Sequence, residues 1–284
     1  MSRDFESIEN PAAACFPERA ARWERIASQI IEKRKNSYTV TVKYPLPPPF
    51  LSLDNVKIAF VSDLHYTASP RCRAILDEIV SEIEKENCNI LLLGGDICGD
   101  SSHLKYLPEV LNRLSRCAER CFAIPGNWER GKLWLGMAYW RELYEKNNIT
   151  FLCNQTACFN GISITGTDDC GKGSPALPDK FSADYCNILL THRPDTAVYL
   201  DHDGGQFENC HLAVCGHTHA GQIKFIRGLL PASKYGWKFD HGTFRHILSN
   251  TVMYVSAGLG ELSFPFRFNT QRELLIFGKT TLPL

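Results

Sequence analysis

Seven polar residues follow apolar runs in this chain, at points where folding alone does not require them. They are Asp63, His65, Asp96, Asn127, His192, His217 and His219, within the motifs VSDLH, LLGGD, IPGN, LLTH and VCGHTH. Carboxylate, amide and imidazole groups without thiolates suit manganese, iron or zinc rather than calcium. Two such ions can hold the attacking and the leaving oxygens of a displacement at phosphorus. The pattern therefore predicts a two-metal site whose chemistry is the cleavage of a P–O bond.

Each of these motifs also has an ordinary structural explanation when it is taken alone. A GD pair often ends a strand, a single buried histidine is usually a hydrogen-bonded core residue, and GHTH can form a turn. The prediction depends on the conjunction of five motifs in one order between residues 63 and 219.

The motifs follow segments that alternate between strand and helix patterns. The predicted strands are 56–62, 89–95, 120–126, 186–192, 210–217 and 251–258. Helical periodicity separates the first three of them, at 71–87 and 107–119. This order predicts an α/β fold with mixed sheets, in which ligands gather beyond the carboxyl ends of the strands.

The N-terminal part has a different pattern. Residues 16–35 carry apolar side chains at the spacing of one helical face, which predicts an amphipathic helix. Such a helix packs against its own domain or lies on a membrane. The proline-rich stretch at 45–51 then interrupts regular structure. We therefore expect an N-terminal helix and linker over 1–50 and a catalytic domain over 51–284.

The composition limits the classes of protein to which this chain can belong. The chain has 284 residues, 44% of them hydrophobic, and a formal net charge of zero, so no global field favours nucleic acid. Twelve cysteines occur without a CxxC pair, and the charged N-terminus lacks the apolar stretch of a secretory leader, which indicates a reducing compartment. We expect a cytoplasmic protein without an obligate protein partner, either free or lying against the inner face of the cytoplasmic membrane.

The motifs DLH, GGD, GNWE, LTH and GHTHAGQ resemble those of the calcineurin-like metallophosphoesterases, from residue 56 to about residue 278. The family implies a four-layer sandwich, with two mixed β-sheets face to face between flanking helices. It also implies two divalent ions, of which manganese is our first expectation and iron or zinc the alternatives. Carried over by motif, Asp63, His65 and His219 would bind the first ion, Asn127, His192 and His217 the second, and Asp96 would bridge them. Asp96 and Asn127 would take part in catalysis.

Trp128 stands where this family usually has a histidine that protonates or stabilises the leaving oxygen, a contribution of about 10²–10⁴-fold. Indole is a hydrogen-bond donor that does not titrate near neutral pH. Phosphate leaves a pyrophosphate readily as an anion, so the substitution favours anhydride cleavage; a packing replacement without substrate meaning is the alternative.

A non-histidine residue at this position also resembles the bacterial lipid A enzymes that hydrolyse UDP-2,3-diacylglucosamine, including the chlamydial type. That resemblance implies the release of UMP and 2,3-diacylglucosamine 1-phosphate. The alternatives are a general two-metal phosphodiesterase or phosphatase that acts on nucleotides or other phosphoesters, and a non-catalytic scaffold.

Substrate contacts are also predicted outside the metal motifs. Arg130 either binds a phosphate or is solvated, and Asp168 either contacts a substrate hydroxyl or caps a turn. Glu129 is expected to orient a metal ligand or cap a turn rather than bind metal.

Two further segments could contact the substrate. Lys224 and Arg227 belong to a basic, aromatic-rich segment at 222–248 that could bind phosphate, uracil or an anionic membrane, or form a solvated hairpin. The apolar stretch at 133–144 is either a groove for acyl chains or the core-facing side of a helix.

Overall fold

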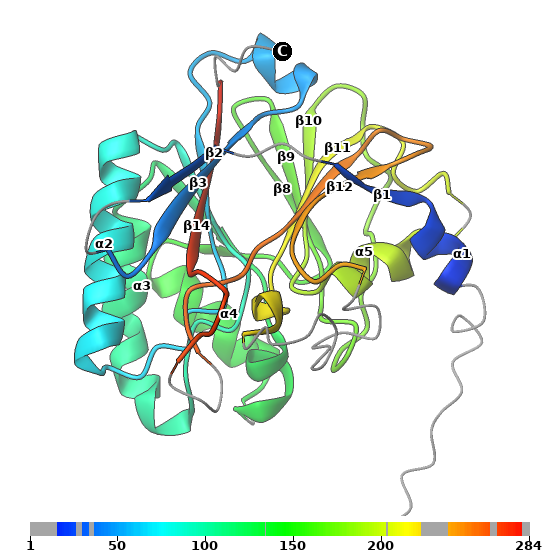
Figure 1. Cartoon of the computed structure of the whole chain (residues 1–284). Helices are drawn as coiled ribbons and strands as arrows, with labels where there is room; N and C mark the ends of the chain where they lie inside the picture. Colours follow the sequence, from blue (N-terminus) through cyan, green and yellow to red (C-terminus); the bar gives the residue numbers. More distant parts are fainter. Residues whose placement is uncertain are drawn as a thin grey trace, which may run out of the picture.

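The computed structural model describes residues 16–26, 30–33, 37–133, 135–202, 204–222, 238–261 and 266–279. In these residues two seven-stranded β-sheets face each other, and helices cover their outer faces (Figure 1). This architecture confirms the α/β fold with mixed sheets that the sequence pattern predicts and the four layers that the family resemblance implies.

One sheet carries the first three metal motifs. Its strand order is β2 (Ile30–Lys33), β3 (Val40–Pro45), β14 (Glu273–Gly278), β4 (Ile58–Val61), β5 (Ile90–Leu93), β6 (Arg120–Ala123) and β7 (Thr150–Phe151). From β4 to β7 the strands are parallel, and α2 (Pro70–Glu86), α3 (Leu107–Ser115) and α4 (Met137–Lys146) connect them. Strands β4 and β5 are apolar and buried throughout, as expected for parallel strands that are covered on both faces.

The second sheet carries the remaining motifs. Its order is β1 (Trp23–Ile26), β12 (Gly242–His246), β13 (Val252–Val255), β11 (Cys210–Cys215), β10 (Cys186–Leu190), β9 (Ile162–Gly166) and β8 (Gln155–Phe159). The strands from β13 to β9 are parallel, whereas β8, β12 and β1 pair antiparallel to their neighbours. The short helices α1 (Phe16–Ala21) and α5 (Pro194–Leu200) lie on the outer side (Figure 1).

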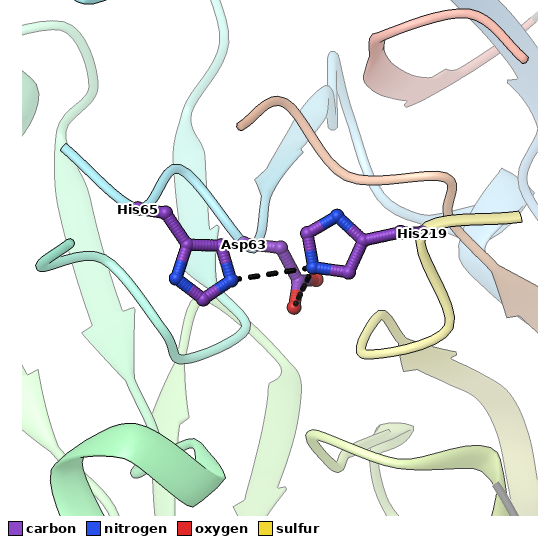
Figure 2. Close-up of side chains that lie close together, drawn as sticks. All are labelled: Asp63, His65 and His219. Carbon is purple, nitrogen blue, oxygen red and sulfur yellow. Dashed lines mark hydrogen bonds and ion pairs between the residues drawn. The ribbon is translucent and has the colours of Figure 1, made fainter. Parts of the chain in front are cut away.

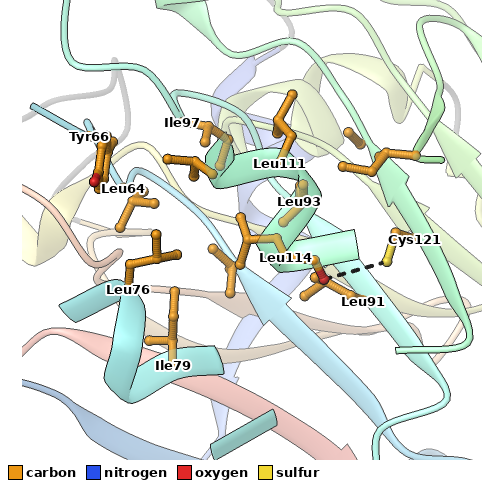
Figure 3. Close-up of a cluster of buried hydrophobic side chains, with 14 of the residues drawn as sticks. Leu64, Tyr66, Leu76, Ile79, Leu91, Leu93, Ile97, Leu111, Leu114 and Cys121 are labelled. Atoms are coloured by element: carbon orange, nitrogen blue, oxygen red, sulfur yellow. Dashed lines mark hydrogen bonds between the residues drawn. The ribbon is translucent and has the colours of Figure 1, made fainter. Parts of the chain in front are cut away.

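Alternation along the central strands divides the core into layers. In β4, Ile58 and Phe60 belong to the cluster between the sheets, whereas Ala59 and Val61 belong to the cluster beneath the helices. Figure 3 shows the helix-side cluster, in which Leu111 of α3 lies near Leu93 of β5. Because side chains pack against both faces of this sheet, the ends of its strands are held in fixed positions.

The predicted amphipathic helix over residues 16–35 is wrong. Helix α1 ends at Ala21, and the chain then forms β1 and β2, which join opposite sheets. Trp23 supplies the reason, because its ring is buried against Phe207 and His246, with ring centroids 5.8 and 4.9 Å away, while its backbone pairs with β12. Tertiary packing here overrides the helical periodicity. Strands that precede residue 51 thus pair with strands that follow it.

Within the described ranges no helix has the length and apolar character needed to cross a bilayer. The eleven cysteines of these ranges are free thiols, and most are buried. Burial raises the pKa of the Cys121 thiol to about 12, so this thiol resembles a small apolar side chain more than a nucleophile.

Candidate metal centre

All seven predicted ligands follow strands and lie at one edge of the facing sheets. Asp63 and His65 follow β4, Asp96 follows β5, Asn127 follows β6, His192 follows β10, and His217 and His219 follow β11. Residues that are far apart in the sequence are therefore brought together by the parallel arrangement of the strands in each sheet.

The first candidate metal-binding group consists of Asp63, His65 and His219. One side-chain donor atom from each lies within 4.8 Å of the others, and all three residues are buried. Figure 2 shows the two imidazoles facing each other, with 3.2 Å between the Nε2 atoms of His65 and His219. The Nε2 atom of His219 also lies 3.5 Å from Oδ1 of Asp63.

The second group consists of Asp96, His192 and His217, whose donor atoms also lie within 4.8 Å of one another. Nε2 of His192 lies 3.2 Å from Nδ1 of His217 and 3.0 Å from Oδ1 of Asn127. The amide of Asn127 therefore belongs to this group as well.

Asp96 lies between the two groups. Its Oδ2 atom is 3.5 Å from Nε2 of His192 and 3.7 Å from Nε2 of His65. Its other oxygen accepts the backbone N–H of Trp128 at 2.8 Å. A carboxylate oxygen in this position has the placement that a bridging ligand requires.

The donor atoms fit a pair of divalent cations. Oδ1 of Asp63 is buried and has no hydrogen-bond partner within the described residues, whereas its Oδ2 accepts from the Ser62 hydroxyl and the His217 N–H at 2.5 and 2.9 Å. Nδ1 of His192 donates to the Gly94 carbonyl, 2.8 Å away, so in the neutral imidazole that a metal would bind, the lone pair of Nε2 is directed toward the group. Metal-binding histidines are commonly oriented by such a bond.

The electrostatics of the site agree with this fit. Burial raises the pKa of Asp63, and Asp96 raises it further. Burial would lower the pKa of the His192 imidazole, but the carboxylates of Asp96, Asp63 and Asp169 together outweigh burial and raise that pKa to about 10. Two buried carboxylates among imidazoles thus form a site that favours cations.

The backbone at the ligands is strained. Asp63, His65, Asp96, His217 and His219 have φ angles of 53°, 42°, 53°, 70° and 50°. A non-glycine residue in this left-handed region costs on the order of 1–3 kcal/mol, and such residues concentrate at functional sites. The backbone conformation therefore serves the placement of donor atoms rather than stability.

Gly126 allows the second and third motifs to approach each other. A Cβ atom at this position would lie 2.2 Å from Oδ1 of Asp96. Any side chain there would displace the carboxylate that lies between the two groups.

Glu129 lies beneath the ligand loops and is fully buried. Its carboxylate accepts the backbone N–H groups of Asp96, Ile97 and Gly126 at 2.9, 3.0 and 3.0 Å. Burial and the nearby Asp96 raise its pKa to about 7 against these hydrogen bonds. Glu129 thus positions the loops of two motifs, which agrees with the role predicted for it.

Trp128 lies beside the first group. It begins a single π-helical turn over Trp128–Lys132, and its indole packs edge-on against the His65 imidazole. The side chain is half-buried and also contacts the apolar cluster beneath the helices.

The structure places the other residues that were predicted to contact the substrate in different environments. Arg130 and Asp168 bind each other, with Nη2 2.8 Å from Oδ2. Lys224 and Arg227 lie outside the described residues. In the stretch at 133–144, the described residues Leu133 and Trp140 are buried in the core beneath the helices.

Sequence reasoning missed two arginines at the site. Nη1 of Arg193 lies 2.8 Å from Nε2 of His217, and Nη2 of Arg267 lies 3.3 Å from Nδ1 of His219. Arg193 directly follows a predicted ligand, which was an available signal. Arg267 had none, because the loop that places it is remote from every motif.

Comparisons with known proteins agree with the motifs. Residues 56–221 match the family described as calcineurin-like phosphoesterase. A Helicobacter pylori (strain ATCC 700392 / 26695) protein named an uncharacterized metallophosphoesterase is 30% identical over 228 residues, which cover 77% of this chain and 58% of that protein. Escherichia coli (strain K12) phosphodiesterase YaeI is 30% identical over 174 residues, covering 59% of this chain and 62% of YaeI. The chain thus spans less than two thirds of the length of these relatives.

One solved structure provides a further likeness. A crystal structure of a dimetal phosphatase from Danio rerio is 11% identical, with a TM-score of 0.45, and covers 72% of this chain and 88% of that one. The family match itself extends over more than half of the present sequence. The chain belongs to the calcineurin-like metallophosphoesterases, a family of metal-dependent hydrolases.

Proposed function

We propose that this chain hydrolyses the pyrophosphate bond of UDP-2,3-diacylglucosamine and releases UMP and 2,3-diacylglucosamine 1-phosphate. The observation that carries the proposal is the indole of Trp128 against His65, at the position where the family usually has a histidine. The acyl chains of this substrate would bring the enzyme to the inner face of the cytoplasmic membrane.

The seven ligands would hold two divalent ions, for which we propose manganese. Asp63, His65 and His219 would bind one ion, Asn127, His192 and His217 the other, and Asp96 would bind both. Bound ions would neutralise the phosphate charge and supply a strong nucleophile at neutral pH.

The residues beside the two groups favour a leaving group that needs no proton. Trp128 offers no titrating group, and the buried carboxylate of Glu129 is held by three backbone N–H groups. Trp128 therefore has no proton to give to an alkoxide, and Glu129, despite its raised pKa, has both oxygens occupied by backbone N–H groups. A phosphate monoester leaves as a stabilised anion, so cleavage of an anhydride makes the smallest demand on this site.

The test is the release of UMP from UDP-2,3-diacylglucosamine by the purified chain with manganese. We expect turnover that chelator abolishes and that returns when manganese is added. Robust hydrolysis of simple phosphomonoesters without any hydrolysis of the lipid nucleotide would refute the proposal.

The second candidate is a general two-metal phosphodiesterase. The 30% identity to phosphodiesterase YaeI favours it. A panel of nucleotide diesters, nucleotide monoesters and the lipid nucleotide separates the candidates, because the general enzyme would show no preference for the diphosphate.

A further inference from the structure

Two consecutive aspartates after β9 each hold an arginine. Oδ2 of Asp168 lies 2.8 Å from Nη2 of Arg130, and Oδ1 of Asp169 lies 2.6 Å from Nε of Arg193. The two carboxylates are linked as well, since the backbone N–H of Asp169 donates to Asp168 Oδ1 at 2.8 Å. The two guanidinium groups are thus anchored to neighbouring points of one loop.

Both arginines come from segments that carry ligands of the second group. Arg130 follows Asn127 by three positions, and Arg193 is the residue after His192. Arg193 reaches the group directly through its 2.8 Å contact with His217. The arginine pair therefore adjoins the candidate metal centre on the side of the second group.

The two aspartate side chains are more deeply buried than the two arginine side chains. The Asp168 and Asp169 side chains are 3% and 0% exposed, whereas those of Arg130 and Arg193 are 30% and 15% exposed. The negative charge is therefore buried behind the arginines, and the positive charge faces the accessible side. Such an arrangement favours an anion in front of the guanidinium groups.

Donor capacity remains on both arginines. Arg130 uses Nη2 for Asp168, and its Nη1 makes no hydrogen bond within the described residues. Arg193 uses Nε for Asp169 and Nη1 for His217, and its Nη2 makes no hydrogen bond in the same part of the chain. A guanidinium has five N–H donors in a fixed plane, so each arginine can donate hydrogen bonds to an oxyanion while it stays paired with its aspartate.

The loop after β9 closes tightly around this network. A Cβ atom at Gly173 would lie 2.3 Å from the Asp168 carboxylate, and the backbone N–H of Ser174 donates to the same carboxylate at 3.0 Å. The anchoring carboxylate is thus enclosed by backbone rather than exposed to water.

We propose that Arg130 and Arg193 bind the second phosphate of a diphosphate substrate while the attacked phosphate lies between the two metal groups. The phosphates of a pyrophosphate share one bridging oxygen, so the other phosphate must lie directly beside the metal groups, and the arginine pair adjoins one of them. This inference rests on the proposed function for the diphosphate. Asp168 and Asp169 are positioning residues that hold the arginines.

The test uses two probes that are not hydrolysed, methylenediphosphonate and methylphosphonate, titrated calorimetrically into the full chain with manganese. In Arg130→Gln and Arg193→Gln we expect methylenediphosphonate to bind on the order of 10- to 100-fold more weakly, the effect of losing a charged hydrogen bond. At saturating manganese, methylphosphonate binding should stay near its wild-type value. Arg113→Gln is the matched control, because Arg113 also pairs with an aspartate, Asp77, at 2.6 Å on the surface.

Unchanged binding of methylenediphosphonate would overturn the inference. An equal loss for both probes would also overturn it, because the arginines would then bind the attacked phosphate. If either glutamine variant fails to fold, the lysine variants Arg130→Lys and Arg193→Lys replace it, since lysine keeps the charge but loses the planar donor fork.

The outcome is separable from that of the proposed function. Weaker diphosphonate binding in a chain that does not hydrolyse the lipid nucleotide supports the arginine site and refutes the proposed substrate. Hydrolysis of the lipid nucleotide with undisturbed diphosphonate binding in the variants does the reverse.

Discussion

The indole of Trp128 meets the imidazole of His65 at 61°, with 4.5 Å between the ring centroids. The backbone N–H of Trp128 at the same time donates to Asp96. The residue thus keeps its backbone contact with the candidate bridging ligand while its side chain has no group that titrates near neutral pH. The side chain at position 128 can therefore lose its proton donor without loss of the backbone hydrogen bond to Asp96.

Trp128→His should restore a proton donor beside the two groups. We expect the hydrolysis of a dinucleoside phosphodiester, whose alkoxide must be protonated, to rise at least about 100-fold, the lower end of the usual range for general acids. Hydrolysis of the lipid diphosphate should change much less. Steady-state rates on both substrates check this, with Trp128→Phe as the control that adds no donor. Equal acceleration on both substrates would contradict the leaving-group argument.

Asp96→Asn should weaken both metal groups together, because Oδ2 of Asp96 faces His65 in one and His192 in the other. The amide retains an acceptor for the Trp128 N–H but loses the charge. We expect metal affinity to fall at least about 100-fold, since the loss of an outer partner alone costs about 10–100-fold. Chelator competition and elemental analysis measure this. The exposed Asp77→Asn is the control, and full metal content in Asp96→Asn would show that Asp96 is not a shared ligand.

Glu129→Gln should destabilise the fold rather than only reduce activity. Glutamine has one acceptor oxygen, so at least one of the N–H groups of Asp96, Ile97 and Gly126 loses its partner in a buried site. We expect a loss of about 1–3 kcal/mol in the free energy of unfolding, measured with urea. Glu145→Gln on the exposed face of α4 should change it by less than about 1 kcal/mol. A stability equal to wild type would remove Glu129 from the support of the ligand loops.

Glu86 gives the stability a defined dependence on pH. Burial raises the pKa of Glu86, but the ion pairs with Lys43 and Lys57, at 2.9 and 3.3 Å, outweigh burial and hold it below its ordinary value of 4.5. A carboxylate with a lowered pKa stabilises the fold above its unfolded pKa and loses this contribution as pH falls through its folded pKa.

We therefore expect wild type to be more stable than Glu86→Gln at neutral pH, and the difference to shrink progressively below pH 4.5. Urea unfolding of both proteins at several pH values measures the difference. Glu84→Gln, at an exposed position of the same helix α2, should differ from wild type by a small amount that does not follow this trend. A Glu86→Gln difference that grows as the solution is acidified would contradict the assignment.

The sequence predicts the parts of the fold that are determined locally. The continuous apolar runs of β4 and β5 and the helical spacing of α2 predict those elements to within a few residues, because buried parallel strands need no alternation. The motif ligands are predictable for the same reason, since they follow these strands directly. The pairing of β3 with β14 is set by contacts across the whole chain and leaves no local pattern.

Two failures of prediction have specific physical causes. The segment around Trp23 has helical spacing, but strand pairing with β12 and burial against His246 determine its conformation. The second failure concerns Arg193, whose partner Asp169 is 24 residues away, so that the ion pair is apparent only in the folded chain. Interactions between distant segments cannot be read from spacing.

The place of β14 has a consequence for synthesis on the ribosome. This strand lies parallel to β3 on one side and antiparallel to β4 on the other, so it joins the earliest strands of its sheet. Until residues 273–278 have left the exit tunnel, β3 and β4 have open edges, and the loops after β4 and β5 lack a closed platform. The edges of β3 and β4 that β14 covers therefore stay unpaired until this strand emerges, and the loops that carry Asp63 and Asp96 gain their full support only then.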